Sequence, residues 1–372
     1  MKILILTTIL LSVFFGFLSA NTTRELTTST TTTLEEFNIV KWSVLNNGEI
    51  LTYREIRPEK IKVFIFLHAT ACSSLMLNTG GLLGALSAIM PDYRIIALDL
   101  RGNGGSSYNK PIVTFNDFAS DVKAFVINLK ITKFVLMGTC LGGLVSQIFA
   151  AKYPSFLHGL ILDGALGIEG GYDLFSDLTK NKNAPWTLND LSTSSGFYNA
   201  INNALNANDN GQALSNIFGF YQPSQVKSTN FNLLLADMMK TRNLKEVLYG
   251  ELTTNINKNS NPVGVLGTGE VYLITARVLI IHGRGDKFVP VAEAQKLANA
   301  LGQLKTTLVI LPDTVGHFTW YDDLANTVAP IKTFLEANGP LDSFHQASLL
   351  TATGNYLKFG LLFAASLIIF MF

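Results

Sequence analysis

The segment around Cys140 has the residue types of a nucleophilic site. An apolar run, Phe134–Met137, leads into Gly138-Thr139-Cys140-Leu141-Gly142-Gly143, and a stretch with helical spacing follows. This is the nucleophile-elbow pattern with cysteine in the central place, a sharp strand-to-helix turn in which glycines prevent collisions between a Cβ and nearby backbone. Such a turn presents the thiol at a helix N-terminus, where the helix dipole favours the thiolate. Taken alone, the segment fits a small buried cysteine beside packing glycines equally well.

Two further polar residues follow apolar runs farther along the chain. Asp286 comes after Val278–Ile281, and His317 comes after Thr307–Leu311. Because the loops at the carboxyl ends of parallel strands converge, we expect Cys140, Asp286 and His317 to lie close together. A lone aspartate or histidine in a loop is usually a surface feature. The order nucleophile, acid, base, each after an apolar run, instead predicts an activated nucleophile.

The elements that must position these residues alternate along the chain. Strands are expected at Phe37–Leu45, Glu49–Ile56, Lys62–Leu67, Arg94–Leu98, Phe134–Met137, Leu160–Leu162, Val278–Ile281 and Thr307–Leu311. Helical spacing covers Ser74–Met90, Asn116–Leu129, Leu141–Lys152, Val291–Leu301 and Leu324–Glu336. This alternation predicts an α/β fold with a mainly parallel, eight-stranded sheet and helices on both faces. The alternation stops between residues 165 and 262, which predicts an inserted helical lid.

With these segments in view, residues 37–338 resemble the α/β-hydrolase superfamily, in its lipase and epoxide-hydrolase type. The order of Cys140, Asp286 and His317 is the order of that family's triad. Two loops add to the resemblance, His68-Ala69-Thr70 after the third strand and Asp99-Leu-Arg101-Gly-Asn-Gly-Gly-Ser106 after the fourth. The first departs from the family, which usually has glycine where this chain has Ala69. The second is structural in the family, so Asp99 and Arg101 are expected to be scaffold residues.

The resemblance also implies roles for single residues. Cys140, where most relatives carry serine, would be the nucleophile, and His317 would take the thiol proton and later activate water. Asp286 would orient His317. The backbone N–H groups of Leu141 and Thr70 would form the oxyanion hole.

Other polar residues have weaker patterns. Asp163, after Leu160–Leu162, is the alternative acid, because some family members place the acid one strand earlier. His68 and His282 at strand ends are expected to be structural, and His158 and His345 have no partner context. No group of His, Cys and Asp has metal-ligand spacing, so we expect no metal, and we expect no other cofactor.

Composition narrows the class of partner. The net charge is +1 and 15% of residues are charged, which argues against a nucleic-acid partner. The two cysteines, Cys72 and Cys140, are too few for a disulfide scaffold. A Cys72–Cys140 disulfide stays open as an alternative, and it would block the nucleophile.

Both ends of the chain carry targeting patterns. Residues 1–20 have a charged start, an apolar core and a small residue at the end, which predicts a secretory signal peptide; an uncleaved anchor is the alternative. Residues 21–36 are rich in threonine and contain an N-glycosylation triplet at Asn21, which predicts a stalk. Residues 339–372 form a spacer and an apolar tail, typical of a GPI-attachment signal; a tail anchor or a buried helix is the alternative. These patterns predict an exported protein, either secreted or held at the extracellular face of the membrane.

Two functions fit these expectations. The first is a hydrolase that acts on a small ester, thioester or lipid-like acyl substrate through a covalent Cys140 intermediate. The second is a non-catalytic, receptor-like protein that binds a ligand in the same pocket. Aromatic residues of the predicted lid suggest that this pocket is apolar, among them Phe175, Trp186, Phe197, Phe218, Tyr221 and Phe231. The sequence sets no oligomeric state.

Overall fold

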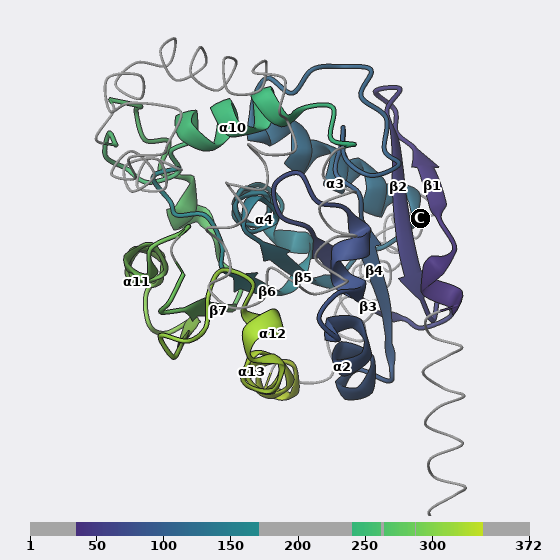
Figure 1. The fold of residues 1–372 in the computed structure, drawn as a ribbon. Helices are drawn as coiled ribbons and strands as arrows, with labels where there is room; N and C mark the ends of the chain where they lie inside the picture. The colour runs from purple at the N-terminus through teal and green to yellow at the C-terminus, as the bar shows by residue number, and fades with distance from the viewer. Residues whose placement is uncertain (1–34, 171–239, 262–263, 287, 338–372) are drawn as a thin grey trace, which may run out of the picture.

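The computed structural model describes residues 35–170, 240–261, 264–286 and 288–337 (Figure 1). The predicted signal peptide, almost all of the stalk, and the C-terminal spacer and tail lie outside the described residues. Most of the predicted lid also lies outside them. Of the lid, only residues 165–170 and 240–261 are described. Among the described residues, no helix has the length and apolarity needed to cross a membrane.

The predicted eight-stranded, mainly parallel sheet is confirmed. Its strand order is β1-β2-β4-β3-β5-β6-β7-β8, in which β1 and β2 are antiparallel and β3 to β8 are parallel. The strands are β1 (Lys41–Val44), β2 (Ile50–Ile56), β3 (Lys62–Leu67), β4 (Tyr93–Leu98), β5 (Phe134–Thr139), β6 (Leu157–Asp163), β7 (Val278–Gly283) and β8 (Thr306–Leu311). The central strands are covered on both faces, which explains why β3 and β5 appear in the sequence as unbroken apolar runs.

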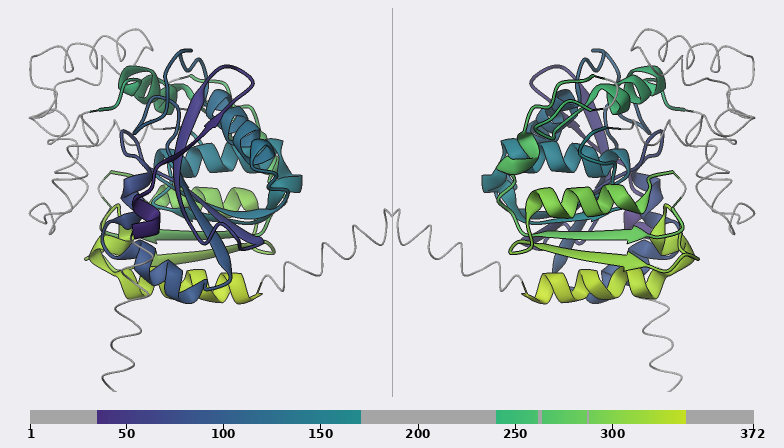
Figure 2. Two further views of the ribbon diagram at one scale, coloured as in Figure 1. Left: turned by 90° about the vertical axis from the view of Figure 1, so that its right-hand side faces the viewer. Right: turned by 90° about the vertical axis from the view of Figure 1, so that its left-hand side faces the viewer.

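Helices cover both faces of this sheet. Figure 2 shows α3, α4 and α11 on one face and α2 and α13 on the other, and α3 packs on α4 while α13 packs on α2. The helices are α2 (Leu82–Ile89), α3 (Phe115–Asn128), α4 (Leu141–Lys152), α10 (Leu244–Thr253), α11 (Val291–Leu301), α12 (Thr319–Asp322) and α13 (Leu324–Ala337), with short 3-10 helices η1 (Ser74–Asn78), η2 (Pro154–Phe156) and η3 (Glu270–Leu273). Helical residues turn apolar side chains to the sheet, so the core lies in the two layers between sheet and helices.

The prediction of a single helix over Ser74–Met90 is wrong, because this stretch forms two helices, η1 and α2. Gly80 and Gly81 between them have φ of +59° and +80°. Gly80 also packs so closely on Trp320 that a Cβ there would lie 2.8 Å from the indole ring. The break therefore makes room for an aromatic side chain from a distant part of the chain, which local helical spacing does not reveal.

The start of the domain also differs from the expectation. The strand predicted at Phe37–Leu45 begins at Lys41, and residues 35–38 form a helical turn instead. Phe37 is completely buried, and the guanidinium of Arg54 donates hydrogen bonds to the carbonyls of Phe37 and Asn38. These contacts hold the turn against the sheet edge.

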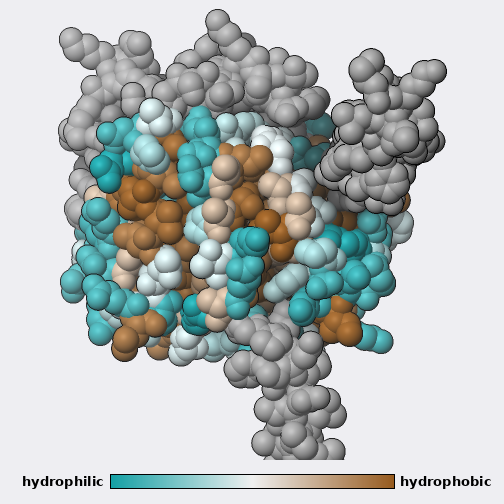
Figure 3. Space-filling view, turned by 90° about the horizontal axis from the view of Figure 1, so that it is seen from below, coloured by the Kyte–Doolittle hydropathy of each residue, from teal (hydrophilic) through white to brown (hydrophobic). Residues whose placement is uncertain are grey.

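The lower side of the molecule in Figure 1 is formed by α2, α12 and α13. Seen from that side in Figure 3, hydrophobic residues gather in broad areas bordered by hydrophilic ones. Helix α10 lies at the opposite, upper end of the molecule in Figure 1.

Candidate active site

Cys140 lies in a strained turn between β5 and α4. Its φ is 51° and its ψ is −118°, a conformation that is uncommon for a residue with a side chain. The turn is closely packed: a Cβ on Gly142 would lie 2.2 Å from the carbonyl oxygen of Leu67, and one on Gly138 would lie 2.2 Å from that of Gly142. Glycine at 142 therefore lets the elbow approach the end of β3, and glycine at 138 lets β5 approach the first turn of α4.

The Cys140 thiol faces the loop after β3. Thr70 Oγ1 lies 3.8 Å from Cys140 Sγ, and the backbone amides of Thr70 and Leu141 also form hydrogen bonds with the thiol. Burial raises the pKa of the Cys140 thiol far above its usual value, and Glu251, when ionised, raises it further, although the three hydrogen bonds lower it. The expectation that the helix N-terminus favours a thiolate is therefore outweighed by desolvation, and the resting thiol is neutral.

Asp286 and His317 form a buried pair in the loops after β7 and β8. His317 Nδ1 lies 2.7 Å from Asp286 Oδ2, while Asp286 Oδ1 accepts hydrogen bonds from the backbone amides of Phe288 and Val289. Burial alone would raise the pKa of Asp286, but the charge of His317 and the hydrogen bonds from both neighbouring histidines lower it well below its usual range. An ionised Asp286 fixes the proton of His317 on Nδ1, so Nε2 is the nitrogen that can act as a base.

His282 is a second imidazole on the same carboxylate. Its Nε2 lies 3.2 Å from Asp286 Oδ2 and 2.8 Å from the carbonyl oxygen of Val289. Burial lowers the pKa of His282, but the hydrogen bond and charge of Asp286 outweigh it, so the pKa is raised. The sequence predicted a structural role for His282 but did not predict its contact with Asp286. No sequence pattern pointed to this contact, because His282 lies in β7 and Asp286 in the loop after it.

The alternative acid Asp163 has different partners. It lies fully buried at the end of β6 and accepts hydrogen bonds from the hydroxyls of Thr319 and, at 3.5 Å, Thr139. Burial raises the pKa of Asp163 to about 7. The hydrogen bonds of Asp163 therefore hold Thr319 and Thr139, while those of Asp286 hold the histidines.

The two cysteines are both buried, and no disulfide joins Cys72 to Cys140. The alternative in which a disulfide blocks the nucleophile therefore does not match this structure.

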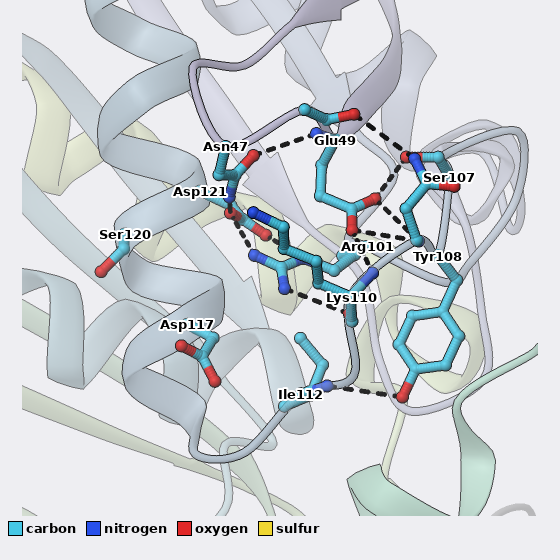
Figure 4. Close-up of polar contacts among 12 residues, drawn as sticks. Asn47, Glu49, Arg101, Ser107, Tyr108, Lys110, Ile112, Asp117, Ser120 and Asp121 are labelled. Atoms are coloured by element: carbon cyan, nitrogen blue, oxygen red, sulfur yellow. Dashed lines mark hydrogen bonds and ion pairs between the residues drawn. The ribbon is translucent and has the colours of Figure 1, made fainter.

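A polar network behind the site anchors the loop after β4 (Figure 4). Arg101 forms a two-point ion pair with Asp121 of α3, at 2.7 and 2.5 Å, and Asn47 of the β1–β2 turn donates to the same carboxylate. Glu49 accepts hydrogen bonds from the hydroxyl of Ser107 and from the backbone amide of Lys110. These contacts give Arg101 the scaffold position that its motif predicts.

Asp99 and His68 connect that loop to the one beside Cys140. Asp99 accepts hydrogen bonds from the backbone amide of Ser74 and the hydroxyl of Thr52, both at 2.6 Å. The backbone amide of Leu100 donates to His68 Nε2 at 3.0 Å. The expected structural roles of Asp99 and His68 agree with these contacts.

Glu251 of α10 is a residue that sequence reasoning missed. It is fully buried, and its Oε1 accepts a hydrogen bond from the hydroxyl of Thr70. Burial raises the pKa of Glu251 to about 8. The sequence around Glu251 gave no signal, because it lies in the region where the strand–helix alternation stops. Among the described residues, no cluster of three or more His, Cys, Asp or Glu side chains could bind a metal ion.

This fold and this arrangement of loops identify the class of protein. The sequence pattern of the alpha/beta hydrolase fold family matches residues 62–324, so the chain belongs to that family. Its solved structural neighbours include a hydrolase from Pseudomonas aeruginosa, with a TM-score of 0.62 and 17% identity over 80% of this chain and 98% of that one. The esterase RhEst1 from Rhodococcus has a TM-score of 0.60 and 20% identity over 81% and 99% of the two chains. At these identities the neighbours show the fold alone.

Curated relatives match shorter parts of the chain. A proline iminopeptidase, PfmaB, of Pestalotiopsis fici is 33% identical over 120 residues, 32% of this chain and 41% of that protein. A serine hydrolase-like protein of Danio rerio is 29% identical over 164 residues, 41% of this chain and 47% of the relative. The 2-hydroxy-6-oxononadienedioate/2-hydroxy-6-oxononatrienedioate hydrolase of Escherichia coli K12 is 28% identical over 211 residues, 56% and 66% of the two chains. The chain thus spans less than half the length of the first two of these relatives.

Proposed function

We propose that the chain is a hydrolase that cleaves a small ester, thioester or related acyl substrate, with Cys140 as nucleophile, His317 as base and Asp286 as orienting acid. The observation that carries this proposal is the buried His317–Asp286 pair, 2.7 Å apart, combined with a cysteine in the strained elbow after β5. The names of its relatives, among them a proline iminopeptidase and a 2-hydroxy-6-oxononadienedioate/2-hydroxy-6-oxononatrienedioate hydrolase, support hydrolysis more than they support one substrate.

The proposed reaction has two halves. In the first, His317 Nε2 takes the thiol proton as Cys140 Sγ attacks the acyl carbonyl carbon, and the leaving alcohol or thiol then receives that proton. In the second, His317 takes a proton from water, the resulting hydroxide attacks the thioester carbon, and the acid leaves as the thiol is restored. Because burial raises the pKa of the Cys140 thiol, the proposed reaction couples the proton transfer to the attack.

The negative oxygen of each tetrahedral intermediate needs hydrogen-bond donors. The backbone amides of Thr70 and Leu141 are the proposed donors, because both already reach the Cys140 sulfur. Ala69 in place of the family's usual glycine is compatible with this loop, since the residue with positive φ there is Ala71, at 58°, and not Ala69.

A non-catalytic, ligand-binding protein is the second candidate. The observation that favours it is the environment of the thiol, because burial, and Glu251 when it is ionised, raise the pKa of Cys140. A thiol held neutral reacts slowly unless His317 removes its proton during the attack.

Hydrolysis of a short-chain aryl ester and of the matching thioester by the full-length protein, kept reduced, tests the proposal. Cys140→Ala serves as the inactive variant, and Cys72→Ala controls for the loss of a buried thiol elsewhere. We expect turnover in wild type and Cys72→Ala and none in Cys140→Ala, with a covalent acyl adduct on Cys140 in the mass spectrum. Equal turnover in Cys140→Ala would show that Cys140 is not the nucleophile, whereas ligand binding without any turnover or adduct in folded wild type would favour the second candidate.

A further inference from the structure

Glu251 places an acidic group beside the proposed nucleophile. Its Oε1 accepts the Thr70 hydroxyl, and that same hydroxyl lies 3.8 Å from Cys140 Sγ. Thr70 thus connects the carboxyl group of α10 to the thiol of the elbow. Glu251 comes from the region between β6 and β7, whereas Cys140, Asp286 and His317 all lie at ends of sheet strands.

The surroundings of Glu251 favour the neutral acid. The residue has no exposed surface, and within the described part of the chain its Oε2 has no hydrogen-bond partner. An ionised carboxylate with one oxygen unsatisfied would be costly in such a site, whereas a protonated carboxyl loses much less on burial.

No cation in the described surroundings compensates a charge on Glu251. Arg101, whose backbone carbonyl accepts a hydrogen bond from Asn243 just before α10, pairs with Asp121, and His317 pairs with Asp286. The shift in the pKa of Glu251 comes from burial, against which the Thr70 hydrogen bond acts, without a contribution from a charged neighbour.

The other charged side chains near α10 also interact with partners other than Glu251. Arg242, just before the helix, donates to the carbonyl oxygen of Ser106. Glu246, in the first turn of the helix, acts on the pKa of Tyr108. Among the described residues, the Glu251 charge acts on the pKa of Cys140.

We propose that Glu251 is a positioning residue of the active site that works in its neutral form, an inference that rests on the nucleophilic role proposed for Cys140. The neutral carboxyl accepts the Thr70 hydroxyl and orients Thr70 beside the sulfur. An ionised Glu251 would instead place a negative charge next to the thiolate and next to the oxyanion, and it would oppose both.

The proposal has a definite dependence on pH. Below a pH of about 8 Glu251 is protonated and the thiol is opposed only by its own burial. As the pH rises through that value, Glu251 ionises and the pKa of the thiol rises with it. Reactivity at Cys140 is therefore held back in the alkaline range, where an ordinary thiol becomes more reactive.

Alkylation of Cys140 tests this inference without requiring turnover. Full-length reduced wild type, Glu251→Gln and Glu246→Gln are treated with iodoacetamide over a range of pH, and peptide mass spectrometry separates Cys140 from Cys72. Glutamine keeps the acceptor for Thr70 but cannot ionise. We expect the midpoint of Cys140 alkylation to lie at lower pH in Glu251→Gln than in wild type, with Glu246→Gln, which removes the same charge from the same helix, at the wild-type midpoint. An unchanged or higher midpoint in folded Glu251→Gln would overturn the inference.

An infrared measurement on the same proteins observes Glu251 directly and decides the question if Cys140 resists alkylation. A protonated-carboxyl carbonyl stretch that disappears as the pH rises through about 8 is expected in wild type and Glu246→Gln, and this component is expected to be missing from Glu251→Gln. Asp163, whose pKa is raised to about 7, is expected to give a component that disappears at lower pH in all three proteins. Identical carboxyl bands in wild type and Glu251→Gln would show that Glu251 is already ionised and would refute the proposal. Failure of ester hydrolysis alone would leave both readouts intact and would count only against the enzyme assignment.

Discussion

At the scale of single residues, the site combines a neutral thiol with an ionised acid. The pKa of Cys140 is raised by burial, while that of Asp286 is lowered by two histidines in spite of its burial. In the proposed reaction, His317 takes a proton from Cys140 and is oriented by Asp286. Its value as a base then depends on Asp286, since the imidazolium that forms during proton transfer needs a nearby negative charge.

Replacing each acid separately distinguishes Asp286 from Asp163. Asp286→Asn removes the charge that stabilises a protonated His317, so we expect kcat to fall by about 10³- to 10⁴-fold with little change in KM. Asp163→Asn keeps an acceptor for Thr319 and should change kcat less than about tenfold. Steady-state hydrolysis of the same ester measures both. The reverse ranking would make Asp163 the acid.

At the scale of elements, local patterns predicted the sheet and its connections well. Lys62–Leu67, Leu141–Lys152 and Val291–Leu301 form with the expected bounds, because each is an apolar or amphipathic run ended by turn residues. The break between η1 and α2 was missed, since it depends on Trp320 packing from far along the chain.

The loops of the candidate site were predictable in part for the same reason. Asp286 and His317 follow recognisable strands, and the structure brings them within 2.7 Å, although their catalytic roles stay predictions. The contact of His282 with Asp286 and that of Glu251 with Thr70 were not predicted, because neither contact leaves a periodic signal. Glu251 in particular reaches the site through tertiary packing of α10.

The elbow makes a prediction about stability. Gly142→Ala would put a Cβ 2.2 Å from the Leu67 carbonyl oxygen, so the backbone of α4 or β3 must move, and we expect a loss of about 2–4 kcal/mol in the free energy of unfolding. Gly84→Ala in α2 is the matched control, because a Cβ there meets nothing within 4 Å. It should instead stabilise the protein by about 0.5–1 kcal/mol, through helix propensity. Urea unfolding of the two variants checks the difference, and equal midpoints would mean that the elbow can relax.

At the scale of the whole molecule, one polar network joins separate parts of the domain. Arg101 and Asp121 connect the loop after β4 to α3, and Asn47 adds the turn between β1 and β2 (Figure 4). These elements are distant in sequence, and the contacts hold the antiparallel edge of the sheet against its parallel centre. The loop after β4, held by this network, in turn contacts the loop beside Cys140 through His68 and Ser74.

We also propose that the whole protein is exported and held at the extracellular face of the membrane by a GPI anchor, on the patterns of residues 1–20 and 339–372. Treatment of intact cells that express the full chain with phosphatidylinositol-specific phospholipase C is expected to release it into the medium. A chain that ends at residue 338 should be secreted without treatment. Full-length protein that stays with the cells after the enzyme releases a known GPI-anchored marker would argue for a tail anchor.

The position of Glu251 has a consequence for how such a protein can change over evolutionary time. The sheet supplies the elbow and the Asp286–His317 pair, whereas α10 supplies an acidic group to the same site from the region between β6 and β7. Substitutions in that region can alter the charge around the sulfur without touching the residues that fold the sheet. A lineage could therefore increase, abolish or restore reactivity at Cys140 by changing the region between β6 and β7 alone, with little effect on the folding of the sheet.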